Sequence, residues 1–408
     1  MRVLMLAQFY PPILGGEEQY TRSLSVALAA RGHDVAVLTL RQRDLPEFEI
    51  DQGVRVYRVR GTLQRLAGLF SDPDRQHAPP FPDPELGLAV ARVLKAERPQ
   101  IVHAHNWLGY QYLPLQWLGS ARLVVSLHDM SMICAKKSYM YDGSPCSGPS
   151  ATKCGVCAIQ HYGVAKGAVT LIGNMLMGAL ERQSVDMFLP VSQTTAERNM
   201  LPHSTLPFTV MPNFLGDELF EPQPGYESYL ATLPSEQFVM FAGGFRQIKG
   251  LDVLLDAYRQ LEGAPPLVLI GYDCADTPDS FPSNVVVQRN WPHGAVMEAW
   301  RRSMLGVVPS LCLETFGLVA LEAMAAGRPV VASGLGGLAE VVADGETGIL
   351  VAPGDVRALR CALDRLIASP KLRSAMGDAA RRRADGFRAS VVVPRVEHVY
   401  ERVIRQGD

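Results

Sequence analysis

Two glutamates in the C-terminal half of the chain lie on either side of a glycine and an apolar helical run, in Glu314-Thr-Phe-Gly-Leu-Val-Ala-Leu-Glu322. Residues 317–319 are expected at the start of this helix, where free backbone N–H groups and the positive end of the helix dipole favour a diphosphate. Carboxylates beside a phosphate site suit neutral hydroxyl groups such as those of a sugar, because carboxylate and phosphate repel each other. A helix with an acidic first turn and no ligand is the alternative.

A second set of candidate residues follows the predicted strands of the N-terminal half. Gly15 and Gly16 lie between a strand and a helix, and a glycine turn at such a place lets the backbone approach a pyrophosphate. His128 and Asp129 follow a buried run and come at the strand edge where parallel sheets bind their ligands. An ordinary turn for the glycines and a structural role for the histidine are the alternatives.

The positions of these residues depend on alternating strands and helices. Strands are predicted at residues 3–7, 34–40, 54–59, 101–104 and 123–127, and helices at residues 17–31 and 85–97. Residues 71–84, with Asp72-Pro73-Asp74, are interpreted as a surface loop rather than a metal site. Repeated strand-helix units indicate a parallel sheet with helices on both faces.

A linker at residues 209–224, rich in proline, asparagine, glycine and acidic residues, separates two sets of such units. After it, strands are predicted at residues 238–242, 267–270, 285–287, 305–309 and 329–332, and helices at 250–261, 295–303 and 317–326. The sequence therefore predicts an α/β protein with two Rossmann-like, doubly wound parallel-sheet domains facing across a cleft. The first domain comprises residues 1–208 and a C-terminal helix in 392–408, and the second comprises residues 225–391.

The composition is typical of a globular protein without a nucleic-acid partner. The chain has 408 residues and a net charge of -2, with 20% charged and 48% hydrophobic residues. Its first residues lack the long apolar core of a signal peptide, and Lys166 and Asn174 interrupt the most apolar stretch, so no transmembrane helix is expected. Seven cysteines in a chain of this length favour a reducing, cytoplasmic location.

Further motifs after Glu322 extend the pattern along the chain. They are Gly336-Gly-Leu-Ala-Glu-Val-Val342 and Asp344-Gly-Glu-Thr-Gly348. Together with the two glutamates, these motifs resemble the nucleotide-sugar domain of glycosyltransferase family 4, a family of retaining enzymes with the GT-B fold. The N-terminal and interdomain counterparts, which extend the resemblance to most of the chain, are Gly15-Gly16, Ala29-Ala-Arg-Gly-His-Asp-Val35, Val102-His-Ala-His-Asn-Trp107 and Val210-Met-Pro-Asn-Phe214.

The resemblance implies a role for each matching residue. Glu322 would bind the ribose hydroxyls of a nucleotide-sugar donor, and Glu314 a hydroxyl of the donor sugar. His128 would contact the donor sugar near its reacting carbon, and Lys249 matches a phosphate-binding lysine. Glu314, His128 and Lys249 are thus the implied catalytic residues. The other donor-binding residues implied are Gly15, Gly16, Phe316, Gly317, Leu318 and Val319, of which the last three offer backbone N–H groups.

The chain departs from the family at Gly244, where the family has an arginine. Arg246 is expected to supply the missing cation if the backbone stays extended, because alternate residues of a strand share a face. With Lys249 and the helix start, it would stabilise the leaving diphosphate, which itself takes the proton of the acceptor on the same face of the sugar. The resemblance therefore implies no cofactor for the chemistry, and a nucleotide sugar as co-substrate.

The expected activity is transfer of a hexose from a UDP or GDP sugar to a hydroxyl or other nucleophile of a small molecule or glycan. Natural-product, metabolite, lipid-linked and polysaccharide acceptors all stay open. The alternatives are a sugar-nucleotide epimerase of the same fold and a non-catalytic sugar-nucleotide-binding protein. A Rossmann-type oxidoreductase is disfavoured, because Gly15-Gly16 lacks the spaced third glycine of that class.

Four cysteines fall in an insert at residues 130–160, which is expected beside the cleft and the acceptor site. They are Cys134, Cys146, Cys154 and Cys157. The two-residue spacer of Cys154-Gly-Val-Cys157 is common in zinc knuckles, so the sequence predicts a structural zinc ion. Two disulfides, an iron-sulfur cluster and free thiols are the alternatives.

Two features bear on contact with a membrane. The helix at residues 163–182, with Met175, Leu176, Met177 and Leu180, is interpreted as a core helix, and contact with lipid is the alternative. The basic residues Arg55, Arg58, Arg60 and Arg65 are interpreted as a solvated face, and contact with an anionic membrane or acceptor is the alternative. Peripheral membrane contact and the oligomeric state therefore stay open.

Overall fold

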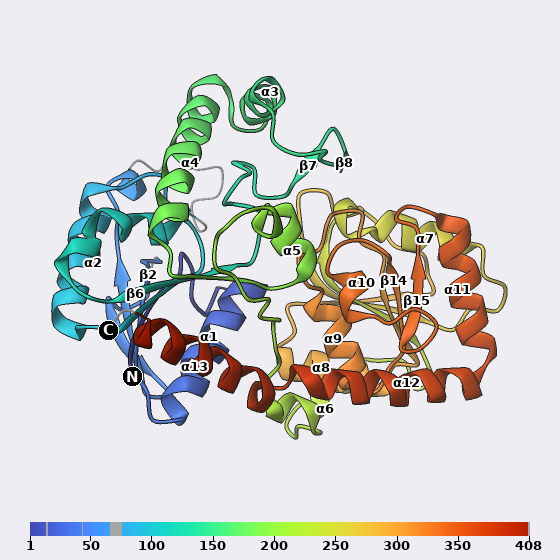
Figure 1. Ribbon diagram of the computed structural model, residues 1–408. Coiled ribbons are helices and arrows are strands. Elements are labelled where there is room, and N and C mark those ends of the chain that lie inside the picture. The colour runs from blue at the N-terminus through green and yellow to red at the C-terminus, as the bar shows by residue number, and fades with distance from the viewer. Residues whose placement is uncertain (14, 43, 66–75, 407–408) are drawn as a thin grey trace. The chain divides into compact units, whose positions relative to one another are not determined.

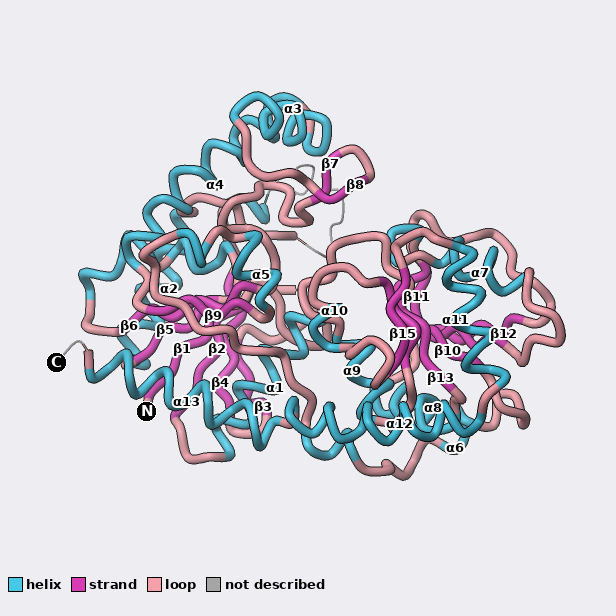
Figure 2. The backbone as a smooth tube through the Cα atoms, turned by 45° about the vertical axis from the view of Figure 1, so that its right-hand side comes forward, coloured by secondary structure: helices cyan, strands magenta, loops and turns pink. Residues whose placement is uncertain are grey.

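The computed structural model describes residues 1–13, 15–42, 44–65 and 76–406, so Asp72-Pro73-Asp74 lies outside the described residues. The chain forms two compact units, each around its own sheet (Figures 1 and 2). The N-terminal unit comprises Met1–Pro212 and Val392–Asp408, and the C-terminal unit comprises Asn213–Val391. The first boundary falls inside residues 209–224, and the chain returns to the N-terminal unit at Val392.

The N-terminal unit has a sheet in the order β3-β4-β2-β1-β5-β6-β9. The strands are β1 (Arg2–Leu6), β2 (Asp34–Leu40), β3 (Phe48–Asp51), β4 (Val54–Val59), β5 (Ile101–Ala104), β6 (Arg122–Leu127) and β9 (Met187–Pro190). β3 runs antiparallel to β4, and the other neighbours pair in parallel. The strand order reverses between β1 and β5, which is where an open parallel sheet binds ligands beyond its carboxyl ends.

The N-terminal unit also contains helices. They are α1 (Gly16–Ala30), α2 (Pro84–Glu97), α3 (Ala151–Tyr162), α4 (Val164–Ser184), α5 (Gln193–Arg198) and α13 (Ala389–Arg405). α3 lies at the far end of α4, away from the sheet (Figures 1 and 2). α2 begins where the Asp83 carboxylate accepts hydrogen bonds from the N–H groups of Glu85 and Leu86, at 3.0 and 3.1 Å. α13 packs on the N-terminal unit through Glu397, whose Oε1 accepts a bond of 2.7 Å from Arg31 Nε.

The C-terminal unit has an entirely parallel sheet in the order β12-β11-β10-β13-β14-β15. The strands are β10 (Val239–Phe245), β11 (Leu267–Asp273), β12 (Val285–Arg289), β13 (Leu305–Val308), β14 (Val330–Ser333) and β15 (Gly348–Val351). Its helices are α6 (Glu227–Leu230), α7 (Leu251–Arg259), α8 (His293–Arg302), α9 (Leu318–Ala325), α10 (Leu338–Val341), α11 (Val356–Ala368) and α12 (Pro370–Ala384). The order reverses between β10 and β13, so a ligand site is expected beyond these two strands.

The expectation for the helix after the cysteine insert is wrong. α4 forms over the predicted residues, but Met175, Leu176 and Leu180 are 63%, 67% and 38% exposed. Of the four apolar residues named above for this helix, only Met177 is buried, and the other buried residues of α4 are small or polar. No helix in the described ranges combines the length and the apolar character needed to cross a bilayer.

Three of the four basic residues considered above, namely Arg55, Arg58 and Arg65 but not Arg60, have ion pairs within the N-terminal unit. Arg55 pairs with Glu97 at 2.5 Å, and Arg58, whose side chain is buried, pairs with Glu49 at 2.7 Å. Arg65 pairs with Glu85 at 3.0 Å (Arg65 Nη2 to Glu85 Oε1). These arginines therefore serve local ion pairs, which gives no support to their alternative interpretation as a surface for an anionic membrane.

Candidate active site

A lysine and a glutamate meet at the switch point of the C-terminal sheet. Lys249 ends the 3-10 turn η7 (Gln247–Lys249) after β10, and Glu314 lies in the loop after β13. Because β10 and β13 are parallel neighbours, both loops leave the same edge of the sheet. Lys249 Nζ lies 2.6 Å from Glu314 Oε1, and Ser310 Oγ donates a hydrogen bond of 2.7 Å to the same oxygen.

Both members of this pair are held in their charged forms. Burial raises the pKa of Glu314, but the Lys249 ammonium and the Ser310 hydroxyl lower it by more, so that it lies below its ordinary value. Burial alone would lower the pKa of Lys249, but the Glu314 carboxylate outweighs this effect and raises it. A cation and a carboxylate are thus presented together over a wide range of pH.

Glycines bring the loops of this site close to each other. A Cβ on Gly250 would collide with the backbone of Pro309, and Leu311 N donates to Ile248 O at 2.9 Å. A Cβ on Gly337 would lie only 2.5 Å from Phe316 Cα. The glycines that the sequence places around the two glutamates are therefore required for close backbone approach rather than for flexibility.

Gly317 starts helix α9 in a conformation that favours glycine. Its φ is 104°, in the left-handed region, and an added Cβ would lie 2.6 Å from Leu338 Cδ2. The N-cap residue Gly317 has no side chain with which to cap this end of α9. The first N–H groups of α9, including those of Leu318 and Val319, lie at the positive end of the helix.

Glu322, in the second turn of α9, is joined by a histidine that the sequence analysis did not assign. His293, the first residue of α8, places Nε2 at 2.9 Å from Glu322 Oε1. Burial would lower the pKa of His293, but the Glu322 carboxylate outweighs burial and raises it. The position of His293 after a predicted strand could have indicated a site residue. Its partner Glu322 could not be identified in this way, because it lies 29 residues further along the chain.

Two expected donor residues have other contacts. The Phe316 side chain is buried, with its ring centroid 5.7 Å from that of Phe387, so Phe316 presents only backbone to a ligand. The backbone does not stay extended from Gly244 to Arg246, because Arg246 N donates a hydrogen bond of 2.8 Å to Gly244 O, and the Arg246 guanidinium lies 3.6 Å from Asp276. A Cβ at Gly244 would lie 3.1 Å from Tyr272 Cζ, so a side chain there requires a small shift of the Tyr272 ring.

In the N-terminal unit, the turn after β1 carries a carboxylate beside the two glycines. Gly16 is the first residue of α1, and the half-buried Glu17 accepts a short hydrogen bond from Asn106 Nδ2. Burial, followed by the nearby charges of Glu18 and Asp129, raises the pKa of Glu17 to about 8. Near neutral pH, Glu17 is therefore mainly protonated and does not repel an anion at the start of α1.

The raised pKa of Glu17 predicts a pH-dependent stability. The unfolded chain releases this proton near pH 4.5 and the folded chain near pH 8, so Glu17 costs stability increasingly as pH rises between these values. Glu17→Gln keeps the acceptor for Asn106 and should melt about 5 °C above the wild type at pH 9, with little difference at pH 4. Thermal unfolding across pH tests this, with Glu236→Gln as the exposed control. Equal melting curves for Glu17→Gln and the wild type would contradict it.

Three histidines line the carboxyl ends of β5 and β6. His103 is fully buried, and its Nδ1 lies 2.6 Å from Tyr400 Oη. His105 Nδ1 lies 3.1 Å from His128 Nε2, with the rings stacked. Burial lowers the pKa of His128 to about 4, so its ring is neutral near pH 7. A neutral His128, held by His105, can exchange a hydrogen bond with a hydroxyl group.

The four cysteines of the insert surround one small cavity of about 40 Å³, next to the hairpin β7 (Met140–Tyr141) and β8 (Ser144–Pro145). They are Cys134, Cys146, Cys154 and Cys157, all as free thiols. Burial raises the pKa of the Cys134 thiol, and backbone hydrogen bonds from Tyr139 oppose this effect. Among the described residues, no group of three or more His, Cys, Asp or Glu side chains is arranged to hold a metal ion. The structural zinc ion therefore stays a prediction.

Metal analysis of the purified protein tests the zinc prediction. We expect about one zinc ion per chain, because four thiolates complete a tetrahedral site. Cys154→Ser with Cys157→Ser should abolish binding and lower the melting temperature by several degrees, since metal binding stabilises the fold. Cys361→Ser, at an exposed cysteine, is the matched control. Metal-free protein with intact thiols would end this hypothesis.

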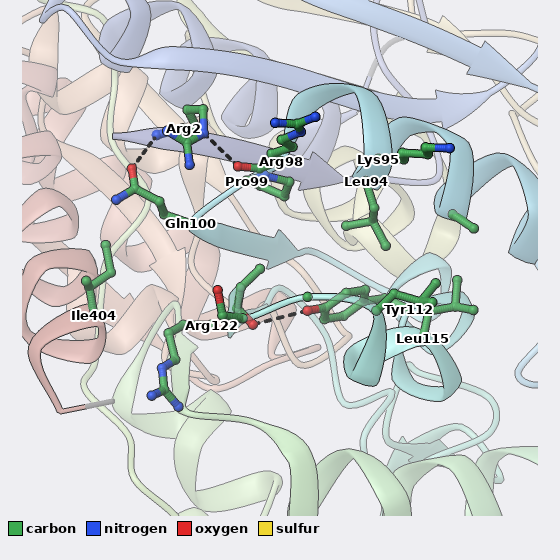
Figure 3. Close-up of a pocket in the computed structure, with 15 residues that line it drawn as sticks. Arg2, Leu94, Lys95, Arg98, Pro99, Gln100, Tyr112, Leu115, Arg122 and Ile404 are labelled. Atoms are coloured by element: carbon green, nitrogen blue, oxygen red, sulfur yellow. Dashed lines mark hydrogen bonds between the residues drawn. The ribbon is translucent and has the colours of Figure 1, made fainter. Parts of the chain in front are cut away.

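A cavity of about 760 Å³ lies at the opposite edge of the N-terminal sheet (Figure 3). Arg2 and Arg122, at the amino ends of β1 and β6, line it together with Gln100. Gly16 and His128 follow the carboxyl ends of the same two strands. This cavity is therefore not the candidate active site, although it is large. The candidate residues of each unit lie beyond the carboxyl ends of the strands, at the switch point of its sheet.

Comparison with solved structures defines the class of the protein. Sucrose-phosphate synthase from Thermosynechococcus elongatus matches with a TM-score of 0.77 and 22% identity, covering 99% of both chains. HepE from Anabaena in complex with UDP matches with a TM-score of 0.70 and 17% identity, covering 98% of this chain and 100% of that one. The fold is therefore GT-B, with two Rossmann-like units, as the sequence analysis predicts.

Family models and relatives identify the family. Residues 231–383 match the model of glycosyl transferases group 1, and residues 15–173 match the glycosyl transferase 4-like domain. A D-inositol 3-phosphate glycosyltransferase of Kineococcus radiotolerans is 30% identical over 428 residues, covering 96% of this chain and 91% of the relative. A glycogen synthase of Mycobacterium tuberculosis is 27% identical, covering 94% and 90%. The chain belongs to the glycosyltransferases of family 4 and is an enzyme of that class.

Proposed function

We propose that the enzyme transfers a hexose, with retention of anomeric configuration, from a UDP or GDP sugar to a hydroxyl group of a small molecule or glycan. The observation that carries this proposal is the Lys249–Glu314 pair beside the start of α9. A cation and the N–H groups of a helix start suit a diphosphate, and a carboxylate suits a sugar hydroxyl. The C-terminal unit, at residues 225–391, would thus bind the donor, and the N-terminal unit the acceptor.

Within this proposal, each contact has one role in donor binding. Lys249 and the N–H groups of Leu318 and Val319 hold the diphosphate. Glu314 accepts a hydrogen bond from a sugar hydroxyl, and Glu322, oriented by His293, accepts bonds from the ribose hydroxyls. Arg246 would contribute to the diphosphate only after leaving Asp276, which lies 3.6 Å away.

The N-terminal residues would complete the reaction. The neutral His128 donates or accepts a hydrogen bond at the donor sugar near its reacting carbon. Gly15 and Gly16 at the start of α1 would bind the pyrophosphate, which the protonated Glu17 does not repel. An oxygen of the leaving diphosphate takes the proton of the acceptor on the same face of the sugar, which produces retention. The protein contributes positioning and stabilises the developing charge.

The names of similar proteins support a nucleotide-sugar donor and a polar acceptor. HepE is described in complexes with UDP and with UDP-glucose, and starch synthase IV from Arabidopsis thaliana with ADP and acarbose. The relatives named above act, by their names, on inositol phosphate and on glycogen. Because the family includes such different acceptors, the acceptor of this enzyme is proposed only as a hydroxyl compound.

A donor screen by thermal shift tests the proposal. Ligands that bind only the folded state raise the melting temperature, because they stabilise it by RT ln(1 + [L]/Kd), where [L] is the free ligand concentration. We expect UDP or GDP to raise it more than ADP or dTDP does, and the preferred sugar nucleotide to release its diphosphate when acceptor is added. No shift with any nucleotide would contradict donor binding. Isomerisation of the sugar nucleotide without an acceptor would identify an epimerase instead.

A further inference from the structure

Helix α4 exposes its apolar side to solvent and buries its more polar side. Its buried positions are mostly small or polar, whereas a helix on a protein surface normally buries its apolar side. The buried residues are Gly167, Thr170, Gly173, Asn174, Met177, Gly178 and Glu181. Lys166 and Gln183 of α4 are exposed, and the exposed large hydrophobic residues of α4 have exposures from 38% to 73%. They are Val164, Val169, Ile172, Met175, Leu176 and Leu180.

The orientation of α4 is fixed by close backbone contacts. A Cβ on Gly167 would lie 2.6 Å from the carbonyl oxygen of Ala158 in α3, and one on Gly178 would lie 2.9 Å from that of Met132. A Cβ on Gly173 would likewise lie 2.9 Å from the carbonyl oxygen of Pro80. Only glycine permits these approaches, so α4 cannot rotate to bury its apolar side within the N-terminal unit.

α3 extends the apolar surface of α4. Val156 and Ile159 of α3 are 47% and 40% exposed, and the two helices are connected at Gly163. Both views show α4 rising from the sheet of the N-terminal unit, with α3 at its far end (Figures 1 and 2). We define the exposed apolar residues of α3 and α4 as the hairpin face. Exposed apolar residues gathered on two adjoining helices are typical of an interaction site.

The charge of this segment indicates what the hairpin face contacts. Helices α3 and α4 contain Lys153, Lys166 and Arg182 against one acidic residue, the buried Glu181, a net charge of +2 in a chain of net charge -2. Lys166 lies among the exposed apolar residues of α4, and Lys153 Nζ donates to the neutral Ser147 Oγ. Lysines beside an apolar helix face are typical of helices that lie in the interface of an anionic bilayer.

We propose that the hairpin face binds the surface of an anionic lipid bilayer, with the apolar side chains inserted at the level of the acyl chains and the lysines at the headgroups. A second copy of the chain fits less well, because a symmetric dimer would bring two positively charged segments together. This inference does not depend on the donor site. It places the acceptor-binding unit at a membrane surface, where a lipid-linked acceptor would be available.

Co-sedimentation of the full chain with vesicles tests this inference. We expect binding to vesicles of equal parts phosphatidylglycerol and phosphatidylcholine, and much weaker binding to phosphatidylcholine alone. Ile172→Glu with Leu176→Glu should lower the partition coefficient by at least about ten-fold, because inserted apolar area drives binding. Lys166→Gln should lower it by about five-fold, and less at high salt.

Ile50→Glu with Leu88→Glu is the matched control, since both residues are exposed, lie in the same unit and give the same change of charge. It should bind vesicles like the wild type. The shift of melting temperature caused by the nucleoside diphosphate should be unchanged in both double variants, which separates this test from that of the donor site. Unaltered binding by Ile172→Glu/Leu176→Glu, or no binding by the wild type, would overturn the proposal. A wild-type dimer that this variant dissociates would replace the bilayer with a second copy.

Discussion

Glu314→Ala is expected to lower kcat for glycosyl transfer by about 100- to 1000-fold, in the range found when an aligned polar group of an active site is removed. The substitution removes the acceptor proposed for a sugar hydroxyl and leaves Lys249 without its partner at 2.6 Å. Lys249 would then be free to move from its position at the switch point. The measurement is the rate at which the preferred donor releases its nucleoside diphosphate in the presence of acceptor.

Two controls separate this effect from a loss of folding. Glu314→Gln preserves the shape and the bond from Ser310 but not the charge, so it should fall between alanine and the wild type. Glu346→Gln, at an exposed residue of the same unit, should retain full activity. Melting temperatures of all three variants should lie within a few degrees of the wild type. Near-normal turnover by Glu314→Ala would remove this residue from the reaction.

Lys249→Met is expected to weaken binding of the nucleoside diphosphate by about 1.5–3 kcal/mol, the usual contribution of a hydrogen bond to a charged group. Unlike Glu314→Ala, it should raise Kd as well as lower kcat, because the diphosphate is present in both the donor and the leaving group. The pKa of Glu314 should also rise, since the ammonium that lowers it is gone. Calorimetric titration with the nucleoside diphosphate measures the first effect. Lys371→Met, on the exposed surface of α12, is the matched control.

The two substitutions should not be additive. Each single variant removes the Lys249–Glu314 contact, so the double variant should lose at least about ten-fold less activity than the product of the single losses. Additive losses would mean that the contact seen at 2.6 Å does not exist in the working enzyme.

The architecture could largely be predicted from the sequence, because the spacing of apolar residues along the chain shows which segments form buried strands and helices. β2 and β4 have the predicted bounds, and α9 differs from its prediction by one residue at each end. The run from Glu314 to Glu322 placed its residues correctly, since strand, loop and helix follow one another without an insertion. The alternation of apolar and polar residues predicts such a succession of strand, loop and helix.

The partners of the site residues could not be predicted, because they come from distant parts of the chain. Glu322 meets His293, Glu17 meets Asn106, and Arg246 is drawn toward Asp276. The spacing of apolar residues within one segment gives no information about contacts with distant segments. The reversed polarity of α4 was missed for a related reason, because apolar residues at helical spacing predict a buried face whether the cover is protein or something else.

The central claim is that a nucleoside diphosphate binds between Lys249 and the start of α9. A crystal structure of the chain with the nucleoside diphosphate that raises its melting temperature most is the direct test. We predict diphosphate oxygens at about 2.7–3.2 Å from Lys249 Nζ and from the N–H group of Leu318 or Val319, with the ribose hydroxyls on Glu322. A diphosphate bound elsewhere, for example in the 760 Å³ cavity beside Arg2 and Arg122, would contradict the claim.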